Sequence, residues 1–194
     1  MRKDNGEKKK TYAAVFIIGI MVLSTLGFVL GYNQDTTNAQ NYQDHKFRKV
    51  GNGWTTKIGA KDLVFTYHPS QLEQIPMSLN ASAILSKTKQ IALTYDSNSP
   101  NLQYLADAQF DLERKFNQYA NSYVTSGLTN SSQTSLPQIQ CENSTISMPV
   151  ILIQDGYTTE IQSNESCIIA SAGAPGDTLA LSERIIYTTL GVMK

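Results

Sequence analysis

Residues 11–32 of this chain form an unbroken run without one charged side chain, TYAAVFIIGIMVLSTLGFVLGY. The hydrocarbon core of a bilayer is about 30 Å thick, and a helix needs roughly 20 apolar residues to cross it. Because the run is long enough, the sequence predicts a transmembrane helix over residues 11–32. The remainder of the chain is then a domain tied to a membrane.

The residues before this run predict its orientation. The N-terminal segment MRKDNGEKKK carries five basic side chains against two acidic ones. Because Lys and Arg next to a membrane segment favour the cytoplasmic side, we expect a cytoplasmic N-terminus, a single pass and an extracytoplasmic C-terminal domain at the cell membrane. A cleaved signal peptide and a pilin-type leader are the alternatives. The run is longer than the roughly 7–15 apolar residues of a signal peptide, so its length favours an uncleaved signal anchor.

The segment that follows the run is polar. Residues 33–49, NQDTTNAQNYQDHKFRK, include two aromatic residues and no Val, Leu, Ile or Met. A segment of this composition cannot bury an apolar face of its own, which favours a flexible stalk. The predicted organisation is a basic cytoplasmic tail over 1–10, a signal anchor over 11–32, a stalk over 33–52 and an extracytoplasmic domain over 53–194.

The charge balance of the outer part restricts its partners. From residue 33 onward, 11 Lys and Arg residues face 14 Asp and Glu residues, a net charge of −3. Nucleic-acid binding depends on concentrated positive charge, so the composition argues against a nucleic-acid partner. The expected partners are the lipid bilayer, through residues 11–32, and another envelope or surface protein.

Hydrophobic periodicity predicts both strands and helices in the domain. Residues 54–58 and 63–67 alternate between apolar and polar positions around Gly59-Ala60, the pattern of a strand–turn–strand unit. Ser99-Pro100 is a helix start. The face of the helix that follows is apolar except at Gln109: Leu102, Leu105, Gln109, Leu112, Phe116, Tyr119 and Tyr123.

The C-terminal part adds strands and a last helix. Residues 150–154, VILIQ, are a buried-strand run, and Asp155-Gly156 after them predicts a tight hairpin. Asp177 begins the last helix, on which Glu183 and Arg184 are expected to form structural salt bridges. The predicted fold class is therefore α+β: an N-terminal transmembrane helix followed by a two-layer α/β sandwich, with a mixed sheet and two main helices on one face.

The chain has two cysteines, Cys141 and Cys167. An even number in an oxidising compartment favours one disulfide, and two separate buried thiols are the alternative. Two cysteines and two distant histidines are too few for a zinc site at any usual spacing. We expect no metal and no cofactor.

Four Asn-x-Ser/Thr sequons are candidate glycosylation sites, provided that the domain faces outward. Each lies in a stretch expected to be a loop. Their asparagines are Asn80, Asn130, Asn143 and Asn164.

The C-terminal third also resembles small, uncharacterised single-pass membrane-anchored proteins of archaea. The resemblance is carried by Cys141-Glu-Asn143-Ser-Thr145, Pro149-Val-Ile-Leu, Cys167-Ile-Ile, and Glu183-Arg184-Ile-Ile-Tyr187 followed by Leu190-Gly191. It covers about fifty residues together with the anchor. It implies a topology and no activity.

Candidate catalytic residues are few. His45 lies in the predicted stalk, and His68 precedes Pro69 at a strand end, where catalytic groups do occur. The chain has no G-x-S-x-G, P-loop or G-x-G-x-x-G motif. We therefore name no catalytic residue and expect a non-catalytic binding or structural role at the cell envelope. The alternatives are a small envelope enzyme centred on His68 and a pilin-like filament subunit.

Overall fold

The computed structural model describes residues 12, 15–25, 39–131 and 135–194. The chain divides into two compact units, Met1–Ala39 and Gln40–Lys194. They are described separately.

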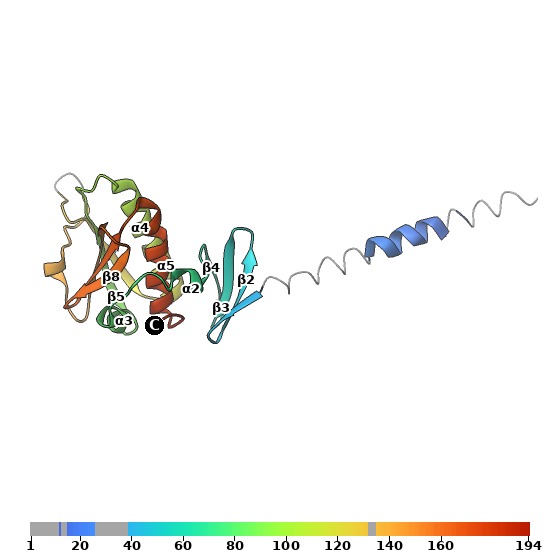
Figure 1. Ribbon diagram of the computed structural model, residues 1–194, viewed down its shortest axis with the longest axis horizontal. Helices are drawn as coiled ribbons and strands as arrows, with labels where there is room; N and C mark the ends of the chain where they lie inside the picture. Colours follow the sequence, from blue (N-terminus) through green and yellow to red (C-terminus); the bar gives the residue numbers. More distant parts are fainter. Residues whose placement is uncertain (1–11, 13–14, 26–38, 132–134) are drawn as a thin grey trace, which may run out of the picture. The chain divides into compact units, whose positions relative to one another are not determined.

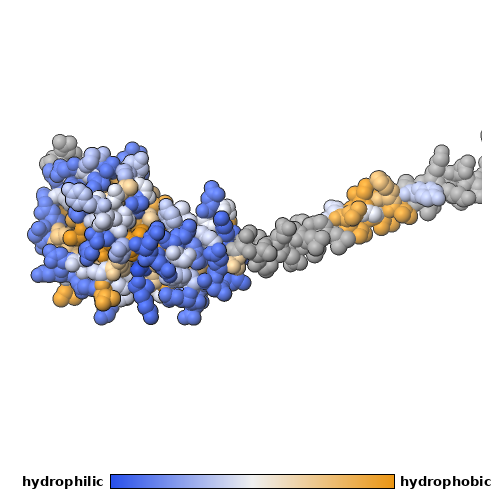
Figure 2. All heavy atoms as spheres, viewed as in Figure 1, coloured by the Kyte–Doolittle hydropathy of each residue, from blue (hydrophilic) through white to orange (hydrophobic). Residues whose placement is uncertain are grey.

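The first unit corrects the prediction of a membrane-spanning helix. Residues 15–25 are helical and their apolar side chains are exposed, as Figures 1 and 2 show. Among the described residues, no helix is long and apolar enough to span a membrane. The predicted transmembrane helix is wrong on this finding. The tail over 1–10 and residues 11, 13–14 and 26–38 lie outside the described part.

The second unit begins with an antiparallel sheet where a stalk was expected. Its strands follow one another in the order β1-β2-β3-β4, and β3 pairs antiparallel with both β2 and β4. The predicted strand–turn–strand unit is β3 and β4. The sheet also takes in residues 39–50, because Phe47 is fully buried in the core and holds this polar stretch on the domain. The bounds are Ala39–Tyr42 for β1, His45–Val50 for β2, Gly53–Ile58 for β3 and Lys61–Phe65 for β4.

A mixed five-stranded sheet forms the other side of the domain. Its order is β6-β5-β7-β9-β8, in which β6, β5, β7 and β9 are parallel and β8 is antiparallel to β9. The bounds are Gln90–Tyr95 for β5, Tyr123–Ser126 for β6, Val150–Asp155 for β7, Glu160–Asn164 for β8 and Cys167–Ala172 for β9.

Helices α4 and α5 lie against each other on one face of this sheet, and α5 runs between the two sheets (Figure 1). The ring of Tyr187 on α5 stacks on Phe65 of β4, with centroids 4.1 Å apart. The α+β class is therefore confirmed, but the domain has three layers rather than two. The bounds are Pro69–Leu72 for α2, Leu79–Leu85 for α3, Leu102–Lys115 for α4, Thr178–Thr189 for α5, Phe116–Ala120 for the π-helical turn η2, Cys141–Asn143 for η3 and Pro175–Asp177 for η4.

The hairpin predicted at Asp155-Gly156 is absent from the described residues. Strand β7 pairs in parallel with β5 on one side and β9 on the other, so neither of its edges is open to β8. The hairpin is formed one connection later by β8 and β9, which turn at Glu165 with a φ of 50°.

Candidate functional site

Several cavities bordered by described residues have polar or charged side chains in their lining, and two of them are candidate sites. One lies beside α4 and α5 and the other at the carboxyl ends of the parallel strands. The first is bordered by paired charges, and the second by amide and hydroxyl groups with a single carboxylate.

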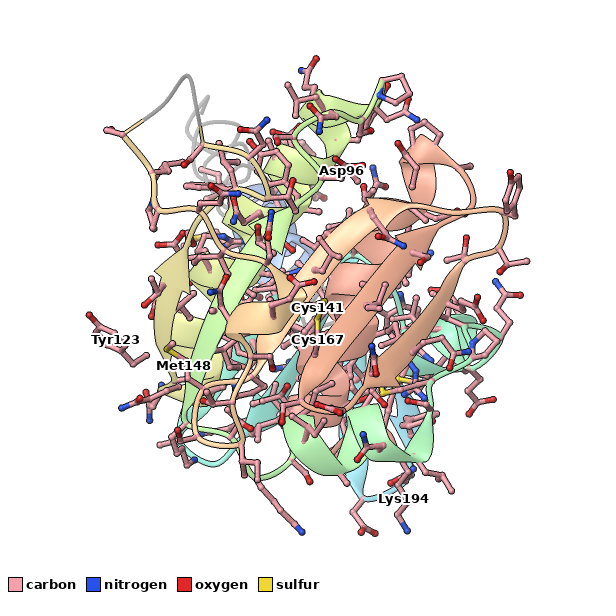
Figure 3. All side chains as sticks on the ribbon, turned by 90° about the vertical axis from the view of Figure 1, so that its left-hand side faces the viewer. Asp96, Tyr123, Cys141, Met148, Cys167 and Lys194 are labelled. Atoms are coloured by element: carbon pink, nitrogen blue, oxygen red, sulfur yellow. A yellow bond between two sulfur atoms is a disulfide. The ribbon has the colours of Figure 1, made fainter. Side chains whose placement is uncertain are left out.

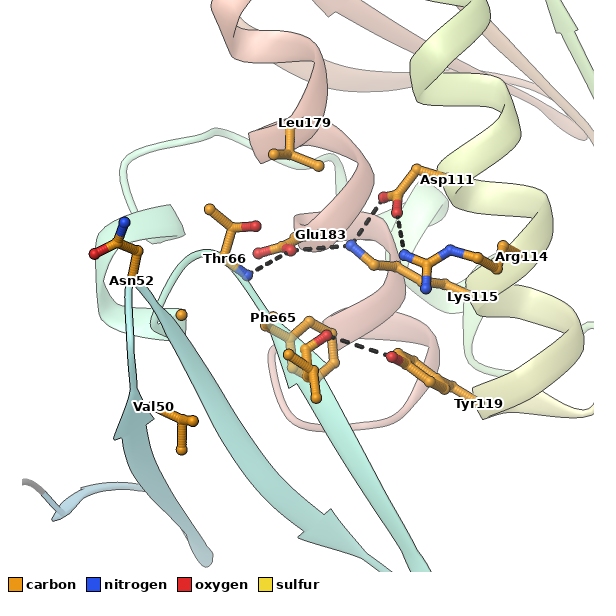
Figure 4. Close-up of a pocket in the computed structure, with 12 residues that line it drawn as sticks. Val50, Asn52, Phe65, Thr66, Asp111, Arg114, Lys115, Tyr119, Leu179 and Glu183 are labelled. Atoms are coloured by element: carbon orange, nitrogen blue, oxygen red, sulfur yellow. Dashed lines mark hydrogen bonds and ion pairs between the residues drawn. The ribbon is translucent and has the colours of Figure 1, made fainter. Parts of the chain in front are cut away.

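The first cavity lies beside a cluster of four charged residues, Asp111, Arg114, Lys115 and Glu183, called here the Lys115 cluster (Figure 4). Lys115 Nζ is 2.8 Å from Asp111 Oδ2 and 2.9 Å from Glu183 Oε1. Arg114 Nη2 donates to Asp111 Oδ1 at 2.8 Å, and this hydrogen bond raises the pKa of Arg114. Two positive and two negative groups leave the cluster neutral.

Glu183 joins three elements through one carboxylate. Its Oε1 accepts from the backbone N–H of Thr66 and its Oε2 from that of Tyr67, each at 2.8 Å. The side chains of Lys115 and Glu183 are 3% and 1% exposed. A buried charge is stable only when it is paired and hydrogen-bonded, and here each charge has its partners within the fold. The adjoining cavity, about 340 Å³, is therefore bordered by charged groups that are already paired with one another.

The second cavity, about 480 Å³, lies where β5, β6 and β7 end, and we call it the polar crevice. Parallel strands bring their carboxyl ends to one edge of a sheet, and Figure 3 shows Asp96, directly after β5, at that edge. The strand that follows β5 in sequence, β6, lies on one side of β5 in the sheet, and the next strand, β7, lies on its other side. Such a reversal of strand order is a topological switch point, the place where ligands bind in open α/β sheets. The lining residues are Asp96, Asn98, Thr129, Asn130, Gln138, Gln140, Leu152 and Gln154.

Hydrogen bonds hold this lining in place. The Nε2 atoms of Gln138 and Gln140 donate to Thr129 O at 3.0 and 2.9 Å. The backbone N–H of Asn98 donates to Asp96 Oδ1 at 3.0 Å. None of the lining residues is Lys, Arg or His. The crevice thus combines one carboxylate with several amide and hydroxyl groups on fixed backbone.

Asp155, at the same edge of the sheet, has a different role. Its carboxylate accepts from Ser99 Oγ and from Asn101 Nδ2, the latter at 3.0 Å. Ser99 Oγ in turn accepts from the backbone N–H of Asn101 at 2.8 Å. Asp155 therefore fixes the segment that begins α4, and it is not one of the residues lining the crevice.

His68, the candidate base of the alternative enzyme interpretation, is a core residue. It is 3% exposed, and its ring lies among those of Phe47, Trp54 and Tyr42. Its Nδ1 is 2.8 Å from Ser70 Oγ. Neither His68 nor His45 lines either cavity. Burial lowers the pKa of His68, and the nearby charge of Glu73 opposes this only in part.

This burial predicts a pH dependence of stability. The unfolded chain takes up a proton on His68 near pH 6.5, whereas the folded protein does so only at lower pH. We expect the free energy of unfolding to fall as the pH drops below about 6.5, measured by urea denaturation between pH 7.5 and 5. The variant His68→Asn, which keeps a side-chain acceptor but does not titrate, should lose this decrease. The control His45→Asn should keep it, and an unchanged slope in His68→Asn would contradict the assignment.

The predicted disulfide is confirmed. Cys141 and Cys167 are bonded, with Cα atoms 5.3 Å apart, and the bond ties η3 to β9 on the face of the sheet opposite α4 and α5. Figure 3 looks onto this face and labels both cysteines. All four sequon asparagines are exposed: Asn80, Asn130, Asn143 and Asn164.

The part of the chain that the structure describes contains no group of three or more His, Cys, Asp or Glu side chains placed to hold a metal ion. Comparisons of the chain with protein-family models, with curated proteins and with solved structures find no match. The resemblance to archaeal membrane-anchored proteins therefore stays a prediction from the sequence.

Proposed function

We propose that Gln40–Lys194 is a non-catalytic binding domain that works outside the cytoplasm, with the polar crevice as its binding site. The ligand we infer is small and neutral and carries several hydroxyl or amide groups. The observation that carries this proposal is the convergence on one cavity of polar side chains from β7, from the segment directly after β5 and from the β6–β7 connection. A volume of about 480 Å³ falls within the usual range of small-molecule sites.

The chemistry of the lining supports a neutral ligand. Amide side chains both donate and accept hydrogen bonds, as hydroxyl and amide groups of a ligand require. Phosphate and carboxylate ligands are usually held by Arg or Lys, which the lining lacks, and Asp96 adds a negative charge that opposes an anion. Leu152 offers one apolar contact.

Two further observations support the remaining parts of the proposal. The imidazole of His68 is buried among aromatic rings, and the charges of the Lys115 cluster are paired with one another, so neither site offers an accessible base or nucleophile. The disulfide supports an extracytoplasmic location, because such bonds persist in oxidising compartments. Binding to another envelope or surface protein stays a prediction.

The experiment is a titration of the isotope-labelled protein with neutral saccharides (glucose, mannose, N-acetylglucosamine and its dimer), followed by NMR. Shift changes are expected to concentrate on the crevice residues. Asp96→Asn and Gln154→Leu should each weaken binding about tenfold, the loss of roughly one good hydrogen bond.

The control Asn117→Ala, in η2 and outside the crevice lining, should bind like the parent protein. Shift changes confined to other surfaces, or stronger binding of the matching sugar phosphates, would contradict the proposal. Release of a chemically altered saccharide would favour the enzyme alternative.

A further inference from the structure

The face of the five-stranded sheet opposite the helices carries two sequon asparagines next to the disulfide. Asn164 at the end of β8 pairs with Cys167 of β9, and residues paired across antiparallel strands share one face of the sheet. Asn143 is the last residue of η3, two positions after Cys141. Both asparagines are exposed. Two acceptor motifs therefore flank the Cys141–Cys167 bond on the face of the sheet opposite α4 and α5.

The side-chain amides of these two asparagines are available for modification. The side chain of Asn164 has no hydrogen bond to the residues that the structure describes. Asn143 uses its carbonyl oxygen, Oδ1, to accept from the backbone N–H of Gln140 at 2.8 Å. That bond does not need the amide nitrogen Nδ2, which is the atom that a glycan would occupy.

Asn80 has the same motif, but its side-chain amide nitrogen already donates two hydrogen bonds. Its Nδ2 donates to Ser163 Oγ at 3.1 Å and to Glu165 O at 3.0 Å. These two bonds use both N–H groups and join the first turn of α3 to the β8–β9 turn. A sugar on this nitrogen would replace one N–H and separate the two elements.

We propose that Asn143 and Asn164 are N-glycosylated and that Asn80 is not. The co-reactant is a lipid-linked oligosaccharide phosphate. A bond forms between Nδ2 and the sugar C1, the C1–oxygen bond to the lipid phosphate breaks with its electron pair leaving on the phosphate, and Nδ2 loses one proton. In the folded protein both N–H groups of Asn80 Nδ2 are used, and a chain that carried a glycan there could not form both bonds.

Asn130 lies outside the argument for two reasons. It lines the polar crevice, and its sequon extends to residue 132, beyond the described residues. The inference rests on the extracytoplasmic location proposed above and is independent of the ligand in the crevice.

The test is mass spectrometry of peptides from the full chain purified from its native cells. Glycan mass is expected on the peptides that contain Asn143 and Asn164, and the Asn80 peptide should be unmodified. Asn143→Gln and Asn164→Gln should each remove one glycan from the intact mass. Ser166→Ala, which leaves Asn164 in place, should have the same effect as Asn164→Gln.

Ser82→Ala is the matched control, since it abolishes the Asn80 sequon while leaving both bonds of Asn80 possible. It should change the intact mass only by the substitution itself. A glycan on Asn80, or an unmodified Asn143 or Asn164, overturns the inference. Thiol labelling of the same sample separates the two proposals: bonded cysteines without glycans refute only the glycosylation, whereas free cysteines refute the extracytoplasmic location as well.

Discussion

Replacing Glu183 by Ala should lower the free energy of unfolding by about 3–5 kcal/mol, the usual cost of removing one member of a buried ion pair. The variant leaves Lys115 buried with Asp111 as its one remaining carboxylate. It also removes the acceptor of the backbone N–H groups of Thr66 and Tyr67. An unsatisfied buried donor is itself costly, so the effect should exceed that of losing a surface ion pair.

Urea denaturation of the parent protein and three variants tests this expectation. Asp107→Ala, an exposed acidic residue on α4, is the matched control and should change stability by less than about 0.5 kcal/mol. The double variant Lys115→Met/Glu183→Leu removes both charges and should recover part of the loss, because no unpaired charge is then buried. A loss below about 1 kcal/mol in Glu183→Ala would show that the cluster does not hold the three elements together.

The role of Glu183 was only partly predictable from the sequence. The expectation of a structural salt bridge is confirmed for Glu183, whose partner Lys115 lies on α4. Arg184, expected to form one too, donates instead to Thr188 Oγ1 and to Lys194 O. Polar residues are buried all along α5 because this helix lies between two sheets, and only one sheet was predicted from the sequence.

Local sequence patterns predicted individual strands and helices better than they predicted which strands pair. The strand–turn–strand unit predicted around Gly59-Ala60 is confirmed as β3 and β4. Gln109 is the polar position on the apolar face of α4, and its burial is compensated because its Nε2 donates to Leu93 O and Gly127 O. No hairpin forms at Asp155-Gly156, because β7 pairs with β5 and β9 and not with β8, the strand that follows it in sequence. Within the predicted stalk, residues 39–50 include the strands β1 and β2, and Phe47 of β2 is fully buried; residues 33–38 lie outside the described part.

The polar crevice was not predictable for a related reason. Its side chains come from β7, from the segment after β5 and from the connection between β6 and β7, and together they form no contiguous motif. The position of Asp96 directly after the apolar run Ile91-Ala92-Leu93-Thr94-Tyr95 was the available signal. It becomes informative only when the order β6-β5-β7 is known, because that order brings the three strand ends together.

Loss of the disulfide should lower the free energy of unfolding by about 3.5 kcal/mol, the chain-entropy value for a loop of this length. The bond closes a separation of 26 residues that includes the β6–β7 connection from η3 onward, β7 and β8. The test is urea denaturation of the variant Cys141→Ser/Cys167→Ala, with Ala at position 167 because that side chain is 2% exposed beside Ile139 and Val150.

The parent protein measured in excess dithiothreitol is the matched control. It should agree with the variant, because both lack the crosslink while their remaining contacts are the same. The crosslink restricts the unfolded chain more than it adds contacts to the folded one. The protein with the disulfide should therefore fold faster than the variant, and this difference in folding rate should account for most of the difference in stability. Equal unfolding free energies with and without the bond would contradict this expectation.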